Sequence, residues 1–483
     1  MFVESSPEIE EAESLIYRSG FVLSRARVTG YPFDRWRSHR LGHFVLQTHP
    51  DASCTVREVS GQASALLGDA FDPERGIHNK AQLLEDLAGA TSEQEFYKAL
   101  DRLAGRFLLI LPRGDGGLHL YQDAMGSRTV FYATNQPVAA SHSEIVGKLV
   151  GNGLSDFVIP FLTSRNYAQK ATKYLPGVAT PYEHVRQLTP NTQLSMPKQS
   201  VTRFWPRGPH EKPTTDTEAL DALILHMRGL VEHFQVARLK SLIGLTAGTD
   251  SRLLFAAFRS SDPYLFTYIR SESGTDENDR DTEAAGALAE RYGLTRDIYP
   301  VVTKPTLTDA SDAFSYAYRR STAYMRGSTS LWPKRLAAQN FDYAGTRFVR
   351  GFGGEVMRGY YQNMKTRIGV INERQLANAY DINAGSMMTR RLFREFMDIV
   401  SFEPNALHGR DPNDIFYWEH RMGIWGSTAM SEVDLAQCSL AGYNSRNLFD
   451  LFLALPWESR TARTAFHQAT LELAPLLAES PEG

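Results

Sequence analysis

The sequence is poor in cysteine, and it lacks long apolar runs and an excess of charge of one sign. Its two cysteines, Cys54 and Cys438, lie far apart in a chain of 483 residues and in no metal-ligand spacing, which speaks against a disulfide framework or a structural zinc site. No apolar run approaches the roughly 20 residues of a membrane span. The first residues, Met1-Phe-Val-Glu-Ser-Ser-Pro-Glu, are acidic, whereas a secretory signal begins with basic residues. We therefore expect a cytoplasmic protein with no membrane partner.

The balance of charge also limits the partners. The chain has 52 basic and 55 acidic residues, for a net charge of −3, so it has no general attraction for nucleic acid. Hydrophobic residues make up 42%, which is ordinary for a globular protein. The length favours two to three domains.

The first part of the chain predicts strands joined by short turns. Apolar or alternating runs at 107–112, 118–122 and 130–133, with a hairpin signal at Gly114-Asp-Gly-Gly117, indicate an antiparallel sheet region. A helical period covers Gln82 to Leu103. Pro206 to Thr215 has the composition of a linker. We therefore expect one domain over residues 1–207, a linker over 208–215 and a second domain over 216–483.

The second part alternates helices and strands. A helical face begins near Asp216 or Thr217, either of which is a candidate N-cap, and a buried strand at Tyr264–Ile269 precedes an alanine-rich helix at Asp281–Tyr292. This order favours an α/β domain with a parallel sheet. Ligands of such folds bind at the carboxyl ends of the strands.

One segment at such a position has the composition of a phosphate-binding loop. An apolar strand ending at Leu245 runs into Thr246-Ala-Gly-Thr-Asp-Ser251 and then a helix, which brings backbone amides and hydroxyls to an anion at a helix N-terminus. Asp250 is out of place in a plain anion site, but it fits one in which a carboxylate holds Mg²⁺ on the phosphates. An ordinary strand-to-helix turn with an N-cap stays open as the alternative.

This hexapeptide resembles the pyrophosphate loop of the ATP pyrophosphatases, Ser-Gly-Gly-x-Asp-Ser. With Gly105-Arg-Phe107, Leu120-Tyr-Gln-Asp-Ala-Met-Gly126, Ser141-His-Ser-Glu144 and the segment from Pro176 to Asn191 in the first half, the whole chain resembles the asparagine synthetase and β-lactam synthetase family. The resemblance implies an N-terminal glutaminase-like antiparallel sandwich of the Ntn type and a C-terminal parallel-sheet ATP pyrophosphatase domain. The family's glutaminase nucleophile is a cysteine at residue one after methionine removal, and this chain has Phe2 there. A phenyl ring cannot attack an amide, so we expect no glutaminase activity, as in the lactam-forming members.

A second segment, Arg350-Gly-Phe-Gly-Gly-Glu-Val-Met-Arg-Gly-Tyr-Tyr361, resembles the family's second ATP motif. Glu355 falls on the position of its metal-binding Asp. Phe352 stands where lactam synthetases carry a catalytic Tyr. A third segment, Tyr443 to Arg460, is a moderate match. The family's C-terminal catalytic lysine has no counterpart, because no lysine follows Lys365; Arg421, Arg446 and Arg460 are candidates to supply positive charge.

The resemblance thus implies an AMP-forming carbon–nitrogen ligase that adenylates a small-molecule or peptide carboxylate, with ATP and Mg²⁺ as cofactors and an amine as the second substrate. Asp250 and Glu355 would bind Mg²⁺, and Arg421 would serve in catalysis. The expected nucleotide contacts are Leu245, Thr246, Gly248, Thr249, Asp250, Ser251, Arg252, Tyr268, Gly351, Gly353 and Arg358. A nucleotide-binding scaffold or partner subunit and an adenylating enzyme acting on a nucleobase or tRNA stay open, as does a homodimer.

Overall fold

The first half of the chain folds into two antiparallel sheets. The computed structural model describes residues 14–114, 116–151, 153–170, 172–271, 280–302, 312–322, 331–363 and 367–476. The sheet orders are β10-β8-β9-β1-β3-β2 and β12-β11-β7-β6-β5-β4. The strands are β1 (Phe21–Ser24), β2 (Arg37–Leu41), β3 (Phe44–Thr48), β4 (Cys54–Val59), β5 (Gln62–Phe71), β6 (Ala104–Pro112), β7 (Leu118–Gln122), β8 (Phe131–Ala133), β9 (Ala139–Ala140), β10 (Val185–Gln187), β11 (Thr192–Met196) and β12 (Ser200–Arg203).

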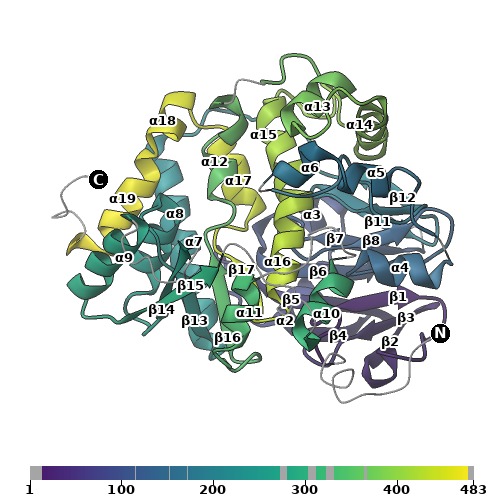
Figure 1. Ribbon diagram of the computed structural model, residues 1–483, viewed down its shortest axis with the longest axis horizontal. Helices are drawn as coiled ribbons and strands as arrows, with labels where there is room; N and C mark the ends of the chain where they lie inside the picture. The colour runs from purple at the N-terminus through teal and green to yellow at the C-terminus, as the bar shows by residue number, and fades with distance from the viewer. Residues whose placement is uncertain are drawn as a thin grey trace.

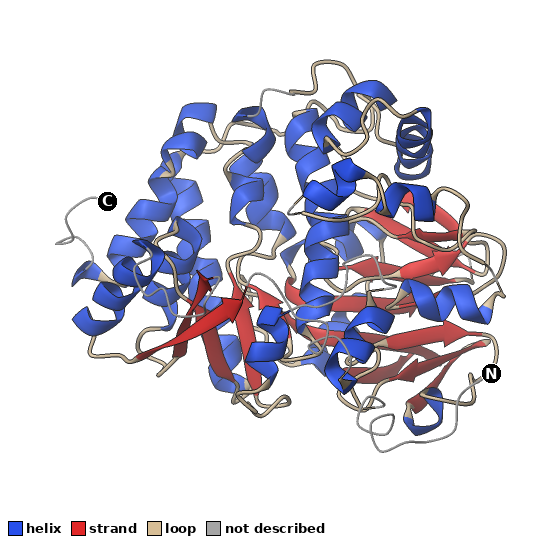
Figure 2. Ribbon diagram, viewed as in Figure 1, coloured by secondary structure: helices blue, strands red, loops and turns tan. Residues whose placement is uncertain are grey.

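The two sheets lie face to face (Figures 1 and 2), and one apolar layer lies between them. Phe21 and Leu46 from one sheet lie in the same buried cluster as Leu67, Leu108 and Ile110 from the other. The expected hairpin is confirmed, since β6 pairs with β7 in antiparallel register. Small helices flank the sheets: η1 (Phe33–Arg35), α4 (Ser143–Leu149), α5 (Val158–Leu162) and α6 (Arg165–Gln169).

The helical period from Gln82 to Leu103 corresponds to two helices, α2 (Lys80–Ala88) and α3 (Glu93–Arg102). The break follows from local chemistry. Gly89 ends α2, and the Ser92 hydroxyl accepts from the Glu95 amide to begin α3, as an N-cap does. The apolar period alone does not reveal such a break, because the apolar faces of both helices pack against the same core.

The second half contains a five-stranded parallel sheet, and the expected mixed α/β class is confirmed. Its order is β15-β14-β13-β16-β17, with β13 (Lys240–Gly244), β14 (Tyr264–Ser271), β15 (Arg296–Val302), β16 (Thr346–Arg350) and β17 (Ser439–Ala441). The chain starts at β13, builds outward through β14 to β15, and returns to the other side of β13 through β16 and β17. The strand order therefore reverses between β13 and β16, which is where doubly wound folds bind ligands.

Helices of the second half lie against this sheet and also reach over the antiparallel sheets (Figures 1 and 2). They are α7 (Asp216–Val236), α8 (Thr249–Phe258), α9 (Arg280–Arg291), α10 (Ala313–Ser321), α11 (Leu331–Ala337), α12 (Gly354–Met357), η3 (Tyr360–Asn363), α13 (Glu373–Tyr380), α14 (Met387–Val400), α15 (Pro412–Phe416), the π-helix η4 (Tyr417–Gly426), α16 (Ser427–Val433), α17 (Arg446–Leu453), α18 (Trp457–Ala462) and α19 (Thr464–Leu473). None of the helices in the described ranges is both long and apolar enough to cross a membrane.

The segment 204–215, all of it described, contains neither helix nor strand. At its end the N-cap of α7 is Thr215, not Asp216 or Thr217. The Thr215 hydroxyl accepts from the Glu218 amide while the Glu218 carboxylate accepts from the Thr215 amide, a capping box that satisfies two amides at once.

The two halves are joined by buried ion pairs. Arg106 in β6 donates to Asp434 at 2.6 Å, and Arg347 in β16 donates to Asp69 in β5 at 2.6 Å. Buried ion pairs keep their strength only when geometry is good and other polar atoms are satisfied. These contacts therefore fix the antiparallel sheets against the parallel sheet.

Candidate functional site

The candidate site lies where the strand order of the parallel sheet reverses. β13 and β16 are neighbours in parallel register, so their carboxyl ends meet at one edge. The loop after β13 leads into α8, which carries Asp250, and the loop after β16 leads into α12, which carries Glu355. The fold thus brings together two acids that lie more than one hundred residues apart in the sequence.

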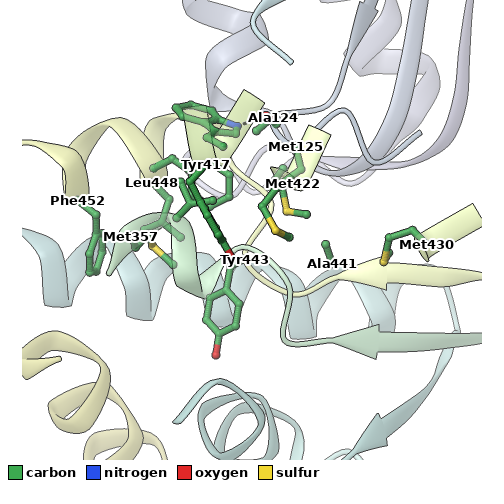
Figure 3. Packing of buried hydrophobic residues seen from close by; sticks show 14 of the residues in the cluster. Ala124, Met125, Met357, Tyr417, Met422, Met430, Ala441, Tyr443, Leu448 and Phe452 are labelled. Carbon is green, nitrogen blue, oxygen red and sulfur yellow. Dashed lines mark hydrogen bonds between the residues drawn. The ribbon is translucent and has the colours of Figure 1, made fainter. Parts of the chain in front are cut away.

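Asp250 is held by two side chains from other parts of the chain. Arg358 Nη2 donates to its Oδ2 at 2.5 Å, and the Tyr443 hydroxyl donates to its backbone carbonyl at 2.7 Å. Figure 3 shows the Tyr443 hydroxyl pointing away from the apolar side chains labelled around it. Burial raises the pKa of Asp250 to about 7, the charge of Glu355 adds to this rise, and Arg358 and Arg463 oppose it. The charged form of this carboxylate therefore gains from any further cation at its free side.

Glycines in the loop after β16 leave room for the Asp250 carboxylate. A Cβ on Gly354 would lie 2.2 Å from Asp250 Oδ1, and one on Gly351 would lie 2.9 Å from Asp250 Cβ. Gly353 has a φ of +102°, and a Cβ there would meet Phe449 and Tyr443 at 3.0 Å. Only a loop without side chains at these positions lets Asp250 approach the backbone that precedes Glu355.

Each of the two acids keeps one carboxylate oxygen that no described residue satisfies. Asp250 Oδ1 and Glu355 Oε2 are buried and have no hydrogen-bond partner among the described residues. No cluster of three or more His, Cys, Asp or Glu side chains suited to a metal occurs in the described ranges. Mg²⁺ commonly uses one or two carboxylates and takes its other ligands from substrate phosphates and water.

The segment from Thr246 to Ser251 is named the phosphate loop after its composition, and its hydroxyls bond to one another. Thr246 Oγ1 and Ser251 Oγ are 2.9 Å apart, the Thr246 amide donates to Ser251 Oγ at 3.2 Å, and the Gly248 amide donates to Thr246 Oγ1 at 3.1 Å. Leu245 continues the strand, because its amide donates to Phe266 O and its carbonyl accepts from Thr267 Oγ1. These residues therefore shape the loop from within.

The N-terminus of α8 faces the space in front of this loop without a side-chain cap. Gly248 is its N-cap and supplies no side-chain hydrogen bond. The first amides of a helix are unsatisfied donors that carry a positive partial charge, so they favour an anion.

Three arginines add positive charge around the same loop. Arg358 pairs with Asp250, and Arg252, in the first turns of α8, has a buried Nε with no partner among the described residues. Arg463 was not identified from the sequence. It lies between α18 and α19 in a left-handed conformation with φ of 58°, and its Nη1 donates to Thr249 Oγ1 at 3.0 Å. No sequence signal marks it, because its position depends on how α19 packs beside α8.

Tyr268 lies in β14, beside the strand that feeds the loop, with its ring 5.0 Å from Phe266 and 5.9 Å from Tyr299. Burial raises the pKa of its phenol. Its place in the sheet is next to the loop and not within it.

The three arginines proposed to replace the missing lysine divide into two groups. Arg446 is buried and donates to Asn191 at 3.0 Å and Asp101 at 3.4 Å. Arg460 is buried and donates to Asp414 at 2.8 Å and to the Met357 carbonyl at 2.9 Å. Both therefore join elements of the fold.

Arg421 is different, because it lies among aromatic rings of η3 and η4 and forms no ion pair with any described acid. Its guanidinium carbon is 5.4 Å from the Tyr360 ring centre and 5.2 Å from that of Trp425. Phe352 extends this aromatic surface, since its ring lies 5.7 Å from Trp425.

The structure therefore brings together Asp250, Glu355, Arg252, Arg358 and the phosphate loop, and it sets Arg421 beside them on the aromatic side. No protein-family model matches the sequence, and no curated protein matches it either. The function of the site must therefore be inferred from the residues that form it.

Proposed function

We propose that the protein is an ATP-dependent ligase that forms AMP and pyrophosphate, adenylating a carboxylate that an amine then converts to an amide or lactam. The supporting observation is the pair of buried carboxylate oxygens of Asp250 and Glu355 that have no partner in the described part of the chain, beside the N-terminus of α8, which has no side-chain cap. The same proposal assigns a glutaminase-like fold to the first half of the chain and an ATP pyrophosphatase-like fold to the second half.

The acidic and the basic residues of the site would have different roles. Asp250 and Glu355 would hold Mg²⁺, which neutralises phosphate charge when bound. The α8 amides, Arg252 and Arg463 would hold the phosphates that leave. A substrate carboxylate oxygen attacks the α-phosphorus, and the bond from that phosphorus to the oxygen bridging to the β-phosphorus breaks, so pyrophosphate departs with the electron pair. This step needs positioning and charge neutralisation rather than a strong base, and the site offers both.

Glutamine hydrolysis is not part of the proposed activity. Burial raises the pKa of the Cys54 thiol to about 11, and burial also raises the pKa of Cys438. Since the thiolate is the nucleophilic form, neither cysteine is poised to attack an amide at neutral pH.

ATP binding should require Mg²⁺ and Asp250. Without the cation, two carboxylates repel the triphosphate. We expect Asp250→Ala to weaken ATP·Mg²⁺ binding by about tenfold or more, as expected for loss of a charge-assisted contact. Titration calorimetry with and without Mg²⁺ measures this, with Asp262→Ala, at a turn after α8, as the matched control. Equal affinity with and without Mg²⁺, or in Asp250→Ala, would leave the loop as an ordinary strand-to-helix turn.

A further inference from the structure

The π-helix η4 presents one face to the second ATP loop. Tyr417, Arg421 and Trp425 recur every four residues in it, and Arg421 interacts with both aromatic neighbours. Opposite this face, the ring centres of Tyr360 in η3 and Tyr417 lie 4.9 Å apart, and those of Phe352 and Trp425 lie 5.7 Å apart. π-Helical turns are rare and occur frequently at functional sites.

Arg421 lacks the carboxylate counter-ion that several buried arginines of this protein have. Arg106, Arg347 and Arg460 each pair with a buried carboxylate. Arg421 forms no ion pair with any acid in the described ranges. Its Nη2 contacts Thr172 Oγ1 at 3.4 Å, its guanidinium hydrogen-bonds with the phenols of Tyr174 and Tyr361, and its Nε is buried with no partner among those residues. A largely desolvated guanidinium without a carboxylate is costly, so an anionic ligand group would complete this site.

The surface around Arg421 is accessible and aromatic. Tyr360 is 39% exposed, while Phe352, Trp425 and Arg421 are half-buried. Flat rings favour an apolar or aromatic ligand body, and the arginine favours a carboxylate with planar, two-point geometry.

The aromatic face lies near the proposed metal site. The Tyr417 phenol interacts electrostatically with both Glu355 and Arg421, so both charged groups lie near the same ring. A ligand held by Arg421 over Tyr360 is therefore next to the place where the phosphates of ATP would lie.

Resting on the function proposed above, we infer that the carboxylate substrate is an apolar acid, arylalkanoic in character, whose carboxylate is received by Arg421 and whose body lies on Tyr360, Trp425 and Phe352. The apolar rings favour an apolar ligand body over a second charged group.

The test is equilibrium binding of 3-phenylpropanoate to the full chain without ATP, followed by calorimetry, with glutamate and acetate as comparison ligands. We expect 3-phenylpropanoate to bind at least about tenfold more tightly than either, since stacking and the ion pair act together. Arg421→Met should weaken it by about tenfold or more. Tyr360→Ala should weaken 3-phenylpropanoate while leaving acetate unchanged.

Controls separate this inference from loss of fold and from the proposed reaction. Arg394→Met removes an exposed arginine that pairs with Glu373 on α13 and should bind 3-phenylpropanoate like the wild type, and each variant should bind ATP·Mg²⁺ within about twofold of wild type if the fold and the neighbouring site are intact. Arg421→Lys should retain part of the affinity, since it keeps the charge but loses the planar fork.

Binding of 3-phenylpropanoate that depends on Arg421 supports the inference even if no pyrophosphate forms, and the ligase proposal alone then fails. Pyrophosphate formation with glutamate, unaffected by Arg421→Met, keeps the ligase proposal and overturns the inference. Failure of 3-phenylpropanoate to bind, or a loss of ATP affinity in Tyr360→Ala that shows the rings to hold adenine, also overturns it.

Discussion

At the scale of single residues, the site depends on how closely backbone and carboxylate approach each other. Asp250 Oδ1 lies against Gly354, which leaves no space for a methyl group. Gly369 lies in the same half of the chain and has open space around its Cα. The pair of glycines therefore separates a general cost of replacing glycine from the specific cost of displacing Asp250.

Gly354→Ala should weaken ATP·Mg²⁺ binding by about tenfold or more, because the new Cβ overlaps the Asp250 carboxylate and either the acid or the loop must move. Gly369→Ala should bind as the wild type does. Titration calorimetry on both variants, with thermal unfolding to check the fold, gives the comparison. If the two variants bind ATP alike, Asp250 does not need its present position.

At the scale of elements, α12 is short and is held by contacts from distant parts of the chain. Arg460 of α18 donates to the carbonyls of Met357 and Val356 at its end, and Asp414 of α15 holds Arg460 by an ion pair. A four-residue helix has little stability of its own. This buried pair therefore supports the element that carries Glu355.

Asp414→Ala should lower the free energy of unfolding by about 3 kcal/mol or more, because it leaves the buried Arg460 charge unpaired. The exposed pair of Arg394 and Glu373 is the control, and Glu373→Ala should cost less than about 1 kcal/mol. Urea unfolding followed by circular dichroism measures both. Equal losses would mean that the pair of Arg460 and Asp414 is no more important than a surface ion pair.

The elements that local sequence determines were the ones predicted well. The apolar run into Thr246-Ala-Gly-Thr-Asp-Ser251 predicted β13, its loop and α8, because a strand, a turn of small residues and a helix are all encoded within a few residues. The break between α2 and α3 was missed, since Ser92 acts as an N-cap within a continuous apolar period.

The site was predicted only in part for the same reason. Asp250 and Glu355 stand in recognisable segments, whereas Arg463 reaches Thr249 through tertiary packing, and Arg460, unlike Arg421, has Asp414 beside it. Which arginine has a carboxylate partner depends on the folded chain and cannot be predicted from the composition.

At the scale of the whole molecule, buried histidines link stability to pH. Burial lowers the pKa of His226 and His233 to about 4 and that of His142 and His420 to about 3. The His420 Nε2 accepts the Gly177 amide at 3.1 Å, which requires the neutral ring. In the unfolded chain these groups titrate near pH 6.5.

The free energy of unfolding should therefore fall as the pH falls from about 6.5 towards 4, because these histidines bind protons in the unfolded chain but not in the folded chain. Each such histidine contributes a slope of at most about 1.4 kcal/mol per pH unit. Urea unfolding at pH 7, 6 and 5 tests the sign, and His420→Phe should give a shallower slope than the wild type. A free energy of unfolding that is flat or rises towards pH 5 would contradict this account.

The central claim concerns the whole molecule acting as an adenylating enzyme, and isotope exchange between pyrophosphate and ATP tests it most directly. With Mg²⁺ and a suitable carboxylate but no amine, the wild-type protein should incorporate labelled pyrophosphate into ATP, and Glu355→Gln should suppress the exchange while retaining the fold. The account is contradicted if ATP binds but no label enters it across a broad panel of carboxylates, or if the products are ADP and phosphate.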